Sequence, residues 1–398
     1  MCGIVGLVQQ AASGPVDAAV IRTMCHAIRH RGPEDEGTFL DGSVGLGMRR
    51  LSIIDLSGGR QPIWNEDRSA VIVFNGEIYN YRELRDELVA RGHAFRTHSD
   101  TETVLHLYEE LGAGVVERLR GMFAFAIWDR RQRTLLLARD RFGIKPLYYT
   151  TERGSLAFAS ELKALVAADL TRRELDWEAL DQYFQLGYIP APATPFRDVR
   201  KLEPGHWLRW SEQNGIASER YWDLPQEGTE DPVDPERRVR EWLDDSIRAH
   251  LVSDVPVAAF LSGGLDSSAI VAGMTLAGEN GPPHAFTARY LGSGGKGADE
   301  TALARQLAAR YGVELTVVDV GPDLHDTLEP IVAALDEPHA DDSAIPTWAL
   351  SRVAAASYTV ALTGAGGDEL FAGYRRHLGL LAAEQYARIP RRLRQSLS

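Results

Sequence analysis

Cysteine is scarce in this sequence, which contains only Cys2 and Cys25 among its 398 residues. So few cysteines exclude a disulfide framework and favour a reducing compartment. No apolar run approaches the roughly 18 residues that a membrane-spanning helix requires. The first residues also lack the basic and apolar segments of a secretory signal. We therefore expect a cytoplasmic protein without a membrane partner.

Positive charge is also in the minority, with 43 lysine and arginine residues against 56 acidic ones and a net charge of -13. This balance argues against a nucleic-acid partner, because broad nucleic-acid binding requires a basic face. It is compatible with a local basic pocket for a phosphate ligand. The length predicts two or three globular domains, and a hydrophobic content of 44% can fill their cores.

The first part of the chain contains strand patterns, short helices and many turns. Strands are predicted at residues 3–8, 44–49, 70–74, 123–129 and 134–139. Helices are predicted over residues 81–92 and 102–111. A polar, acidic stretch with several prolines follows at residues 223–235 and shows no periodicity. We interpret this stretch as a linker between domains.

Strand and helix patterns alternate after the linker. The predicted strands are residues 255–261, 285–290, 314–320 and 359–362, and the predicted helices are residues 237–251, 267–276, 300–311 and 324–335. Such alternation is typical of a parallel sheet with helices on both faces. A further helical stretch at residues 378–386 precedes a polar, basic tail.

The stretch VPVAAFLSGGLDSSAIVAGM indicates a phosphate site. An apolar strand ends at Leu261, small residues follow, and Asp266 opens a helix. Small residues let the backbone approach an anion, and a helix N-terminus offers free N–H groups. An ordinary N-capped helix is the alternative, and no lysine follows the glycines as it would in a Walker motif. A second such stretch, TVALTGAGGDELFAGY, would bring Asp368 to the same sheet edge, where both carboxylates could share a divalent cation.

The chain begins MCGIVGLV, which places a cysteine directly after the initiator methionine. Removal of Met1 would give Cys2 a free α-amino group with a pKa near ~8. Such an amine can act as the general base for its own thiol, so no catalytic histidine is needed. A buried structural cysteine is the alternative interpretation.

Motifs along most of the chain carry a family resemblance. The segments CGIVG, RGPEDEG, RRLSIIDLSGGRQP, FNGEIYN and HSDTE resemble class II glutamine amidotransferases, and SGGLDSS resembles the loop of ATP-pyrophosphate-cleaving synthetases. Together with GMFAFAIWD, RDRFGIKPLYY, FASELKAL and GGDELFAGY, they make the chain, from residue 2 to about residue 377, similar to glutamine-hydrolysing asparagine synthetases. The order of these motifs makes a chance similarity untenable.

The resemblance implies a two-domain fold and a reaction. The first domain, residues 2–212, would be a four-layer α/β/β/α N-terminal-nucleophile hydrolase, and residues 236–398 a parallel α/β ATP-pyrophosphatase domain. Glutamine would be hydrolysed in the first domain. An internal tunnel, with the apolar segment 121–129 as one wall, would lead ammonia to an acyl-adenylate made from ATP and a carboxylate, aspartate in the first place. AMP and pyrophosphate would be released, with ATP and Mg²⁺ as cofactors, small molecules as partners and a homodimer as one option.

The resemblance also implies residue roles in the first domain. Cys2 would be the nucleophile, and Asn75 and Gly76 would form the oxyanion hole. The glutamine carboxylate would pair with Arg50, for which the adjacent Arg49 is the alternative. The glutamine ammonium would be held by Glu77 and Asp100. A zwitterionic ligand independently requires one fixed cation and one or two carboxylates.

In the second domain, Leu261 would contact adenine, and Asp266 and Asp368 would hold Mg²⁺. The remaining nucleotide-binding residues implied by the resemblance are Ser262, Gly263, Gly264, Ser267, Ser268 and Gly364.

Two features depart from the family pattern. Ala365 in TGAGGDE stands where family members usually carry a glutamate, which leaves the acceptor carboxylate open. Family members also continue past this motif to a lysine that stabilises the adenylation transition state. No lysine follows Lys296, which lies in a glycine-rich loop, so we expect a chain ending at Ser398 to be a truncated product or part of a larger protein, with its second domain incomplete.

Other functions remain as alternatives. The same chemistry could amidate a cell-surface or secondary-metabolite carboxylate. β-Lactam synthetases and peptide cyclases share the second domain but generally lack an N-terminal cysteine, and sugar-phosphate and phosphoribosyl amidotransferases lack SGGLDSS. Outside the enzymes, a non-catalytic glutamine or nucleotide sensor is the alternative.

Overall fold

The computed structural model describes residues 1–151, 155–225, 233–278, 281–291, 299–321 and 325–389. The chain divides into two compact units. The first comprises Met1–Pro235, Val252–Val255 and Leu324–Ile345, and the second comprises Glu236–Leu251, Pro256–Asp323 and Pro346–Ser398. The middle of the expected linker, Lys296 and the polar tail after residue 389 lie outside the described residues.

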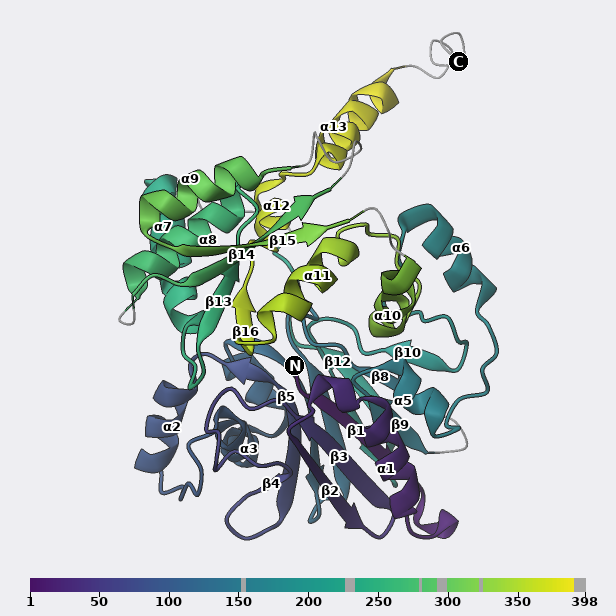
Figure 1. Ribbon diagram of the computed structural model, residues 1–398. Helices are drawn as coiled ribbons and strands as arrows, with labels where there is room; N and C mark the ends of the chain where they lie inside the picture. The colour runs from purple at the N-terminus through teal and green to yellow at the C-terminus, as the bar shows by residue number, and fades with distance from the viewer. Residues whose placement is uncertain (152–154, 226–232, 279–280, 292–298, 322–324, 390–398) are drawn as a thin grey trace. The chain divides into compact units, whose positions relative to one another are not determined.

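Two six-stranded antiparallel sheets form the centre of the first unit, within the residues described (Figure 1). The first sheet has the order β10-β8-β9-β1-β3-β2 and comprises β1 (Gly3–Val8), β2 (Asp35–Asp41), β3 (Val44–Arg50), β8 (Tyr148–Thr150), β9 (Leu156–Ala159) and β10 (Val199–Lys201). The second has the order β12-β11-β7-β6-β5-β4 and comprises β4 (Ile63–Trp64), β5 (Ala70–Ile78), β6 (Gly121–Asp129), β7 (Thr134–Arg139), β11 (His206–Ser211) and β12 (Gly215–Arg220).

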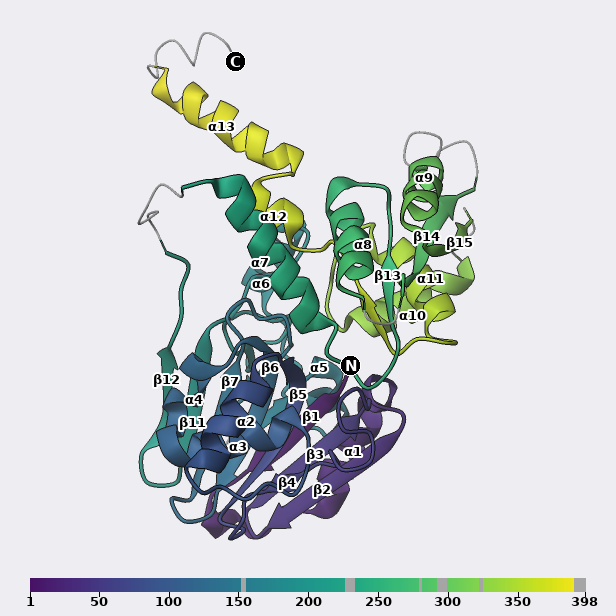
Figure 2. The ribbon, with the colours of Figure 1, turned by 90° about the vertical axis from the view of Figure 1, so that its left-hand side faces the viewer.

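Helices cover the outer face of each sheet (Figure 2). The first sheet packs against α1 (Ala18–Ala27) and α5 (Leu162–Ala167), and the second against α2 (Tyr81–Ala90) and α3 (Asp100–Leu111). The predicted four-layer α/β/β/α architecture is therefore confirmed. The unit also contains α4 (Val115–Arg118), α6 (Trp177–Leu186), α10 (His325–Leu335) and the 3₁₀ turns η1 (Ala11–Ser13), η2 (Arg29–Arg31) and η3 (Gly112–Gly114).

The central strands are apolar at every position because both of their faces are buried. Along β1, Ile4 and Val8 point into the core between the two sheets, while Val5 and Leu7 point into the core under α1 and α5. Side chains alternate between the faces of a strand, so a strand in the middle of four layers needs apolar residues at every position. This requirement explains the unbroken run GIVGLV, which we predicted as a strand.

The second unit contains, among its described residues, a four-stranded parallel sheet of order β15-β14-β13-β16. Its strands are β13 (Val257–Phe260), β14 (His284–Tyr290), β15 (Glu314–Val320) and β16 (Val360–Leu362). The helices are α7 (Pro235–His250), α8 (Leu265–Ala277), α9 (Thr301–Tyr311), α11 (Ala344–Ala354), α12 (Gly367–Phe371) and α13 (Arg375–Arg388). Separate apolar clusters, one with α7, α8 and α9 and one with α11, lie on the two faces of this sheet. The predicted parallel α/β fold is confirmed.

Two elements of the first unit have bounds that differ from the sequence expectation in a way that affects the site. Strand β5 continues past residue 74 to Ile78, because Asn75 and Glu77 keep their pairing with β6. Helix α3 begins at Asp100 instead of residue 102, because the Ser99 side chain caps it by accepting a hydrogen bond from Thr101 N. Both shifts bring polar motif residues onto regular elements.

The segment around α10 belongs to the first unit, although its helical pattern continues the alternation of the second part of the sequence. Asp336, directly after α10, accepts hydrogen bonds from the backbone N–H groups of Leu162 and Lys163 at the start of α5. The neighbouring Glu337 accepts a hydrogen bond from Tyr148 at 2.5 Å and pairs with Lys201 at 2.9 Å. Local periodicity predicts such a helix but not the layer that it joins.

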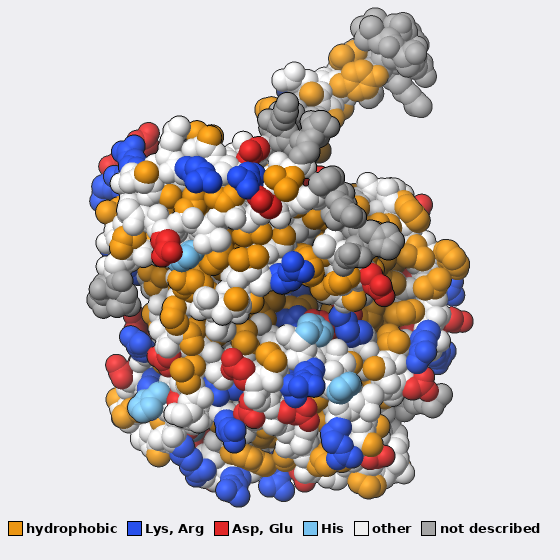
Figure 3. Space-filling view, viewed as in Figure 1, with side chains coloured by type: hydrophobic (Ala, Val, Ile, Leu, Met, Phe, Trp, Pro, Cys, Tyr) orange, Lys and Arg blue, Asp and Glu red, His pale blue; other side chains and the backbone are white. Residues whose placement is uncertain are grey.

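In the described parts of the chain, none of the helices has the length and apolar character needed to cross a membrane. Acidic and basic side chains are interspersed on the face shown in Figure 3, and no continuous basic patch covers the described residues there.

The turn after β7 is organised by one buried carboxylate, that of Asp140, which is 1% exposed. Its oxygens accept hydrogen bonds from the backbone N–H groups of Phe123, Phe142, Ile144 and Lys145, at 3.0 to 3.2 Å. The turn is thereby fastened to the start of β6.

Asp140→Ala is expected to lower the free energy of unfolding by about 3 kcal/mol, because it leaves several buried N–H groups without an acceptor. Chemical denaturation monitored by far-ultraviolet circular dichroism measures this change. Asp86→Ala, at an exposed position of α2, is the control and should change stability by less than about 0.5 kcal/mol. Equal stability of the two variants would refute the role of Asp140.

Candidate active site

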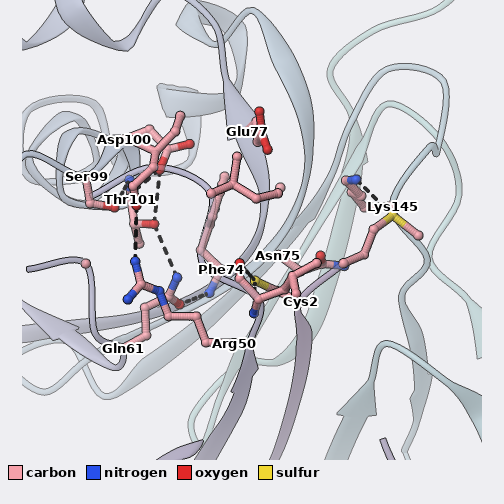
Figure 4. A pocket seen from close by; sticks show the side chains of 16 residues that line it. Cys2, Arg50, Gln61, Phe74, Asn75, Glu77, Ser99, Asp100, Thr101 and Lys145 are labelled. Atoms are coloured by element: carbon pink, nitrogen blue, oxygen red, sulfur yellow. Dashed lines mark hydrogen bonds between the residues drawn. The ribbon is translucent and has the colours of Figure 1, made fainter. Parts of the chain in front are cut away.

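A cavity of about 50 Å³ in the first unit brings together all six residues that we predicted for the glutamine site. These residues lie just before β1, at the end of β3, on β5 and in the first turn of α3. They are Cys2, Arg50, Asn75, Gly76, Glu77 and Asp100, and all except Gly76 are labelled in Figure 4. Met1 also lines this cavity, which has room for only a few water molecules.

Cys2 precedes β1 and presents its thiol to the cavity. The backbone N–H of Leu51 donates to the sulfur at 3.4 Å, and the Leu51 carbonyl lies 3.5 Å from it. Burial raises the pKa of the Cys2 thiol above its usual value. Burial also lowers the pKa of the Met1 amine to about 6. Burial thus disfavours the charged form of both the thiol and the amine.

The start of β1 is held by Arg31. Its Nε donates to the Cys2 carbonyl at 2.8 Å, and its Nη1 pairs with Glu161 at 2.8 Å. The Arg31 and Glu161 side chains are only 9% and 6% exposed, so the pair is shielded from solvent. The backbone of the candidate nucleophile is therefore fixed.

Asn75 and Gly76 lie on β5 beside the thiol. The Asn75 side chain is buried, and its amide nitrogen has no hydrogen-bond partner among the described residues. A buried polar group without a partner costs roughly 1–3 kcal/mol, so this donor is available for a ligand. A Cβ atom at Gly76 would lie 2.2 Å from the Met122 carbonyl oxygen, so only glycine allows this approach of β5 to β6.

The two neighbouring arginines have different surroundings. Arg49 pairs with Glu36 at 2.6 Å and is not part of the cavity wall. Arg50 lines the cavity, and its guanidinium donates to the carbonyl oxygens of residues 54, 55 and 56 at 2.7 to 3.2 Å. No carboxylate in the described part of the chain pairs with Arg50. Of the two arginines, Arg50 is therefore the one whose guanidinium is within reach of a ligand in this cavity, and its pairing with a ligand carboxylate stays a prediction.

Two carboxylates line the same cavity. Burial, followed by repulsion from Asp100, raises the pKa of Glu77 to about 7. Burial also raises the pKa of Asp100 to about 6, against the effect of hydrogen bonds from Ile78 N and from neighbouring hydroxyl groups. A ligand ammonium between them would favour both ionised forms, because it would supply the missing counter-charge.

Lys145 and Gln61 also line the cavity, and sequence reasoning did not single them out. Lys145 is 4% exposed, and burial lowers the pKa of its ammonium. It lies in the turn that Asp140 organises, within the motif RDRFGIKPLYY. Gln61 accepts a hydrogen bond from Phe74 N at 2.7 Å and thereby supports β5 next to Asn75. Membership in the quoted motifs was the available signal for both residues.

A second cavity, of about 750 Å³, lies in the second unit. Of the predicted nucleotide-site residues, those that line it are Leu261, Ser262, Gly264, Asp266, Ser267, Gly364 and Asp368. Gly263 and Ser268 do not line it, and the Ser268 hydroxyl donates to the Gly264 carbonyl at 2.5 Å. Within the loop, the Ser267 hydroxyl accepts from Ser262 N at 3.1 Å, which closes the turn between β13 and α8.

The two glycine-rich turns meet because their strands are neighbours. β13 and β16 pair in parallel, so the turns that follow them lie at the same edge of the sheet. A Cβ atom at Gly367 would lie 2.3 Å from a carboxylate oxygen of Asp266, so glycine is needed for this contact. Neither Asp266 nor Asp368 pairs with a basic side chain within the described residues. Two such carboxylates on one cavity suit a divalent cation.

Comparison with known proteins gives consistent matches along the chain. Residues 1–222 match the family described as glutamine amidotransferase domain, and residues 238–398 match the family described as asparagine synthase. "Asparagine synthetase [glutamine-hydrolyzing] 1" of Bacillus subtilis (strain 168) is 41% identical over 403 residues, which cover 100% of this chain and 62% of that protein.

Two further relatives have similar names. A putative asparagine synthetase [glutamine-hydrolyzing] of Mycobacterium tuberculosis (strain ATCC 25618 / H37Rv) is 40% identical over 100% of this chain and 64% of its own length. Putative asparagine synthetase [glutamine-hydrolyzing] 2 of Methanocaldococcus jannaschii is 35% identical over 99% of this chain and 79% of its own length. The chain thus spans 62% to 64% of the first two relatives.

The raised pKa of Glu77 predicts a pH dependence of stability. The folded state holds the Glu77 proton up to about pH 7, whereas the ordinary pKa is 4.5, so this contribution is full below pH 4.5 and is lost as the pH rises through 7. It amounts to at most about 3 kcal/mol and is reduced by the partial exposure of the side chain. Glu77→Gln should therefore flatten the fall in stability over this pH range.

Denaturation midpoints at a series of pH values measure this effect. Glu83→Gln, at an exposed position of α2, is the control and should keep the wild-type profile. A Glu77→Gln profile parallel to that of the wild type would show that Glu77 has no raised pKa.

Proposed function

The chain belongs to the glutamine-hydrolysing asparagine synthetase family, and we propose that it is a glutamine-dependent amidotransferase. The proposed reaction converts glutamine, ATP and a carboxylate into glutamate, AMP, pyrophosphate and an amide. Aspartate is the first candidate for the acceptor carboxylate. The observation that carries the proposal is the cavity in which the Cys2 thiol and the unpaired Asn75 amide lie with Arg50, Glu77 and Asp100.

The charges of this cavity fit the zwitterionic end of glutamine. Arg50 would bind the α-carboxylate, and Glu77 with Asp100 would bind the α-ammonium. The side-chain amide of glutamine would then point toward Cys2. Met1 lines the cavity, so its removal would both enlarge the site and leave the α-amine on Cys2.

In the first half-reaction, the α-amine takes the proton of the Cys2 thiol, and the thiolate attacks the amide carbon of glutamine. The negative charge that develops on the amide oxygen is stabilised by the Asn75 amide and the Gly76 N–H. The protonated amine gives its proton to the leaving nitrogen, and ammonia departs. Water then cleaves the thioester to give glutamate and the free thiol.

In the second half-reaction, the loop between β13 and α8 would bind the phosphates of ATP, with Leu261 beside the adenine. Asp266 and Asp368 would hold Mg²⁺, which supplies charge neutralisation for the phosphates. The acceptor carboxylate would attack the α-phosphate with loss of pyrophosphate, and ammonia would then displace AMP. Along the sequence, residues 2–212 and 236–398 are the proposed limits of the two domains, and residues 324–345 of the second range pack with the first unit. A cytoplasmic location is part of the proposal.

The second cavity also allows a different acceptor carboxylate. Ala365 lines the second cavity where a family glutamate is usual, so another carboxylate is the second candidate acceptor. A sensor that binds glutamine or nucleotide without turnover is the remaining alternative. Pyrophosphate release that depends on aspartate distinguishes the main proposal from both alternatives.

Cys2→Ala is expected to abolish glutamine hydrolysis and glutamine-dependent pyrophosphate release, because the nucleophile is lost. With Mg-ATP, aspartate and ammonium, the variant should release pyrophosphate at a rate within about twofold of the wild type, because ammonium bypasses the thiol. Cys25→Ala, in the core under α1, is the matched control for the loss of a cysteine.

Glutamine hydrolysis by Cys2→Ala would overturn the nucleophile assignment. Pyrophosphate release that needs a different carboxylate would replace aspartate as the acceptor. Binding of Mg-ATP without release under any of these conditions would favour the sensor.

A further inference from the structure

A cluster of two histidines and two glutamates lies on the helical side of the second sheet, outside both cavities. Glu66 lies in the turn between β4 and β5, His93 follows α2, and His106 with Glu109 lies on α3. We call these four residues the His93–His106 cluster. One ligating atom from each residue lies within 4.8 Å of every other. Three separate segments therefore converge on one point.

The distances in the cluster approach those of a tetrahedral metal site. His106 Nδ1 lies 2.7 Å from a Glu109 oxygen and 3.3 Å from a Glu66 oxygen. His93 Nδ1 lies 3.1 Å from Glu66 and 3.9 Å from the same Glu109 oxygen. Ligands at about 2.0–2.1 Å from a tetrahedral Zn²⁺ are separated by roughly 3.3 Å. The four donors need only small shifts to reach that geometry.

The outer nitrogens of both histidines face carboxylates. His93 Nε2 lies 3.2 Å from Glu110, and His106 Nε2 lies 3.7 Å from Glu102. The Glu110 carboxylate can accept from the outer N–H of His93, which fixes the His93 tautomer with a free Nδ1 lone pair, as in carboxylate–histidine–metal arrangements. His106 Nε2 is beyond hydrogen-bond distance of Glu102 and has no hydrogen-bond partner among the described residues. Glu102 is itself held by the N–H groups of residues 96 and 97, at 2.8 and 2.7 Å.

The glutamates of the cluster are supported in the same way. Asn65 donates to the free oxygen of Glu109 at 2.7 Å, and Ala94 N donates to Glu66 at 3.1 Å. These bonds orient the carboxylates while leaving an oxygen of each toward the histidines. The two carboxylates contribute a formal charge of −2 to the cluster, which a divalent cation would balance.

We propose that the His93–His106 cluster binds a Zn²⁺ ion. The mixture of two nitrogen and two oxygen donors suits Zn²⁺ and disfavours Mg²⁺ and Ca²⁺, which take oxygen ligands. The histidine side chains are 0% and 13% exposed for His106 and His93, whereas Glu66 and Glu109 are 31% and 25% exposed. The ion would therefore enter from the more exposed side of the cluster, where Glu66 and Glu109 lie. The buried His106 would shield it from solvent.

The ion would have a structural effect on the glutamine cavity. α3 carries His106 and Glu109 and begins with Asp100, which lines that cavity. By joining α3 to the segments of Glu66 and His93, Zn²⁺ would fix the position of this helix. The site itself does not depend on the proposed enzymatic activity, because none of its four residues lines either cavity.

The zinc content of the purified chain tests the proposal. The chain is produced with a histidine-free tag and dialysed against metal-free buffer. Mass spectrometry of the metals should find about one zinc ion per chain. His93→Ala and, as a more conservative change, Glu109→Gln should each lower zinc affinity by at least about tenfold. His26→Ala, at an exposed position of α1, is the matched control and should retain the metal.

A second measurement reports the coordination directly. The chain freed of metal by a chelator should bind Co²⁺ with the intense visible absorption of a tetrahedral complex, and Zn²⁺ should displace it. Circular dichroism establishes that each variant is folded. Two results would show that the cluster is a histidine–carboxylate network without a metal. One is a zinc content and a Co²⁺ spectrum that are the same in the wild type, His93→Ala and Glu109→Gln. The other is the absence of both signals from the wild type.

Discussion

The amide of Asn75 reaches the first cavity as a buried donor without an acceptor among the described residues. Leaving such a group unpaired is unfavourable, so the surrounding structure has to hold it in place. It does so through the pairing of β5 with β6, the hydrogen bond from Phe74 N to Gln61, and the close approach that Gly76 allows. The Cys2 thiol is placed next to this donor by β1, so both depend on the packing of the two sheets.

The two cavities are built from the same kinds of structural feature. Each lies where polar groups stand at the end or the edge of a strand, and where a glycine lets two backbone segments approach closely. In the first unit, Gly76 brings β5 against β6, and in the second, Gly367 brings the turn after β16 against Asp266. The charges that line the two cavities differ. Arg50 with Glu77 and Asp100 carries both signs, as the proposed zwitterionic ligand requires, whereas Asp266 and Asp368 are both acidic, as the proposed divalent cation requires.

Individual strands, helices and the parallel sheet could be predicted from local patterns, because unbroken apolar strands and glycine-rich turns have clear signatures. The four-layer arrangement and the residues of the first cavity were expected from the family resemblance of the motifs. Lys145 was missed, since its place in the cavity depends on the turn that Asp140 closes, far in the sequence from Cys2. The layer joined by α10 was missed as well, because periodicity reports a helix and not its neighbours. The spacing of Glu66, His93 and His106 matches no metal motif, so their convergence is visible only in the fold.

The turnover of glutamine by Asn75→Ala tests the central claim most directly, because that claim rests on one unpaired donor beside Cys2. We expect kcat to fall by roughly 10²–10³-fold, with a much smaller change in KM, since the donor would act on the charge of the transition state. Circular dichroism of the variant should match that of the wild type, because the side-chain nitrogen of Asn75 has no hydrogen-bond partner among the described residues. An unchanged kcat would contradict the account, because the buried amide of Asn75 would then have no part in the chemistry at Cys2.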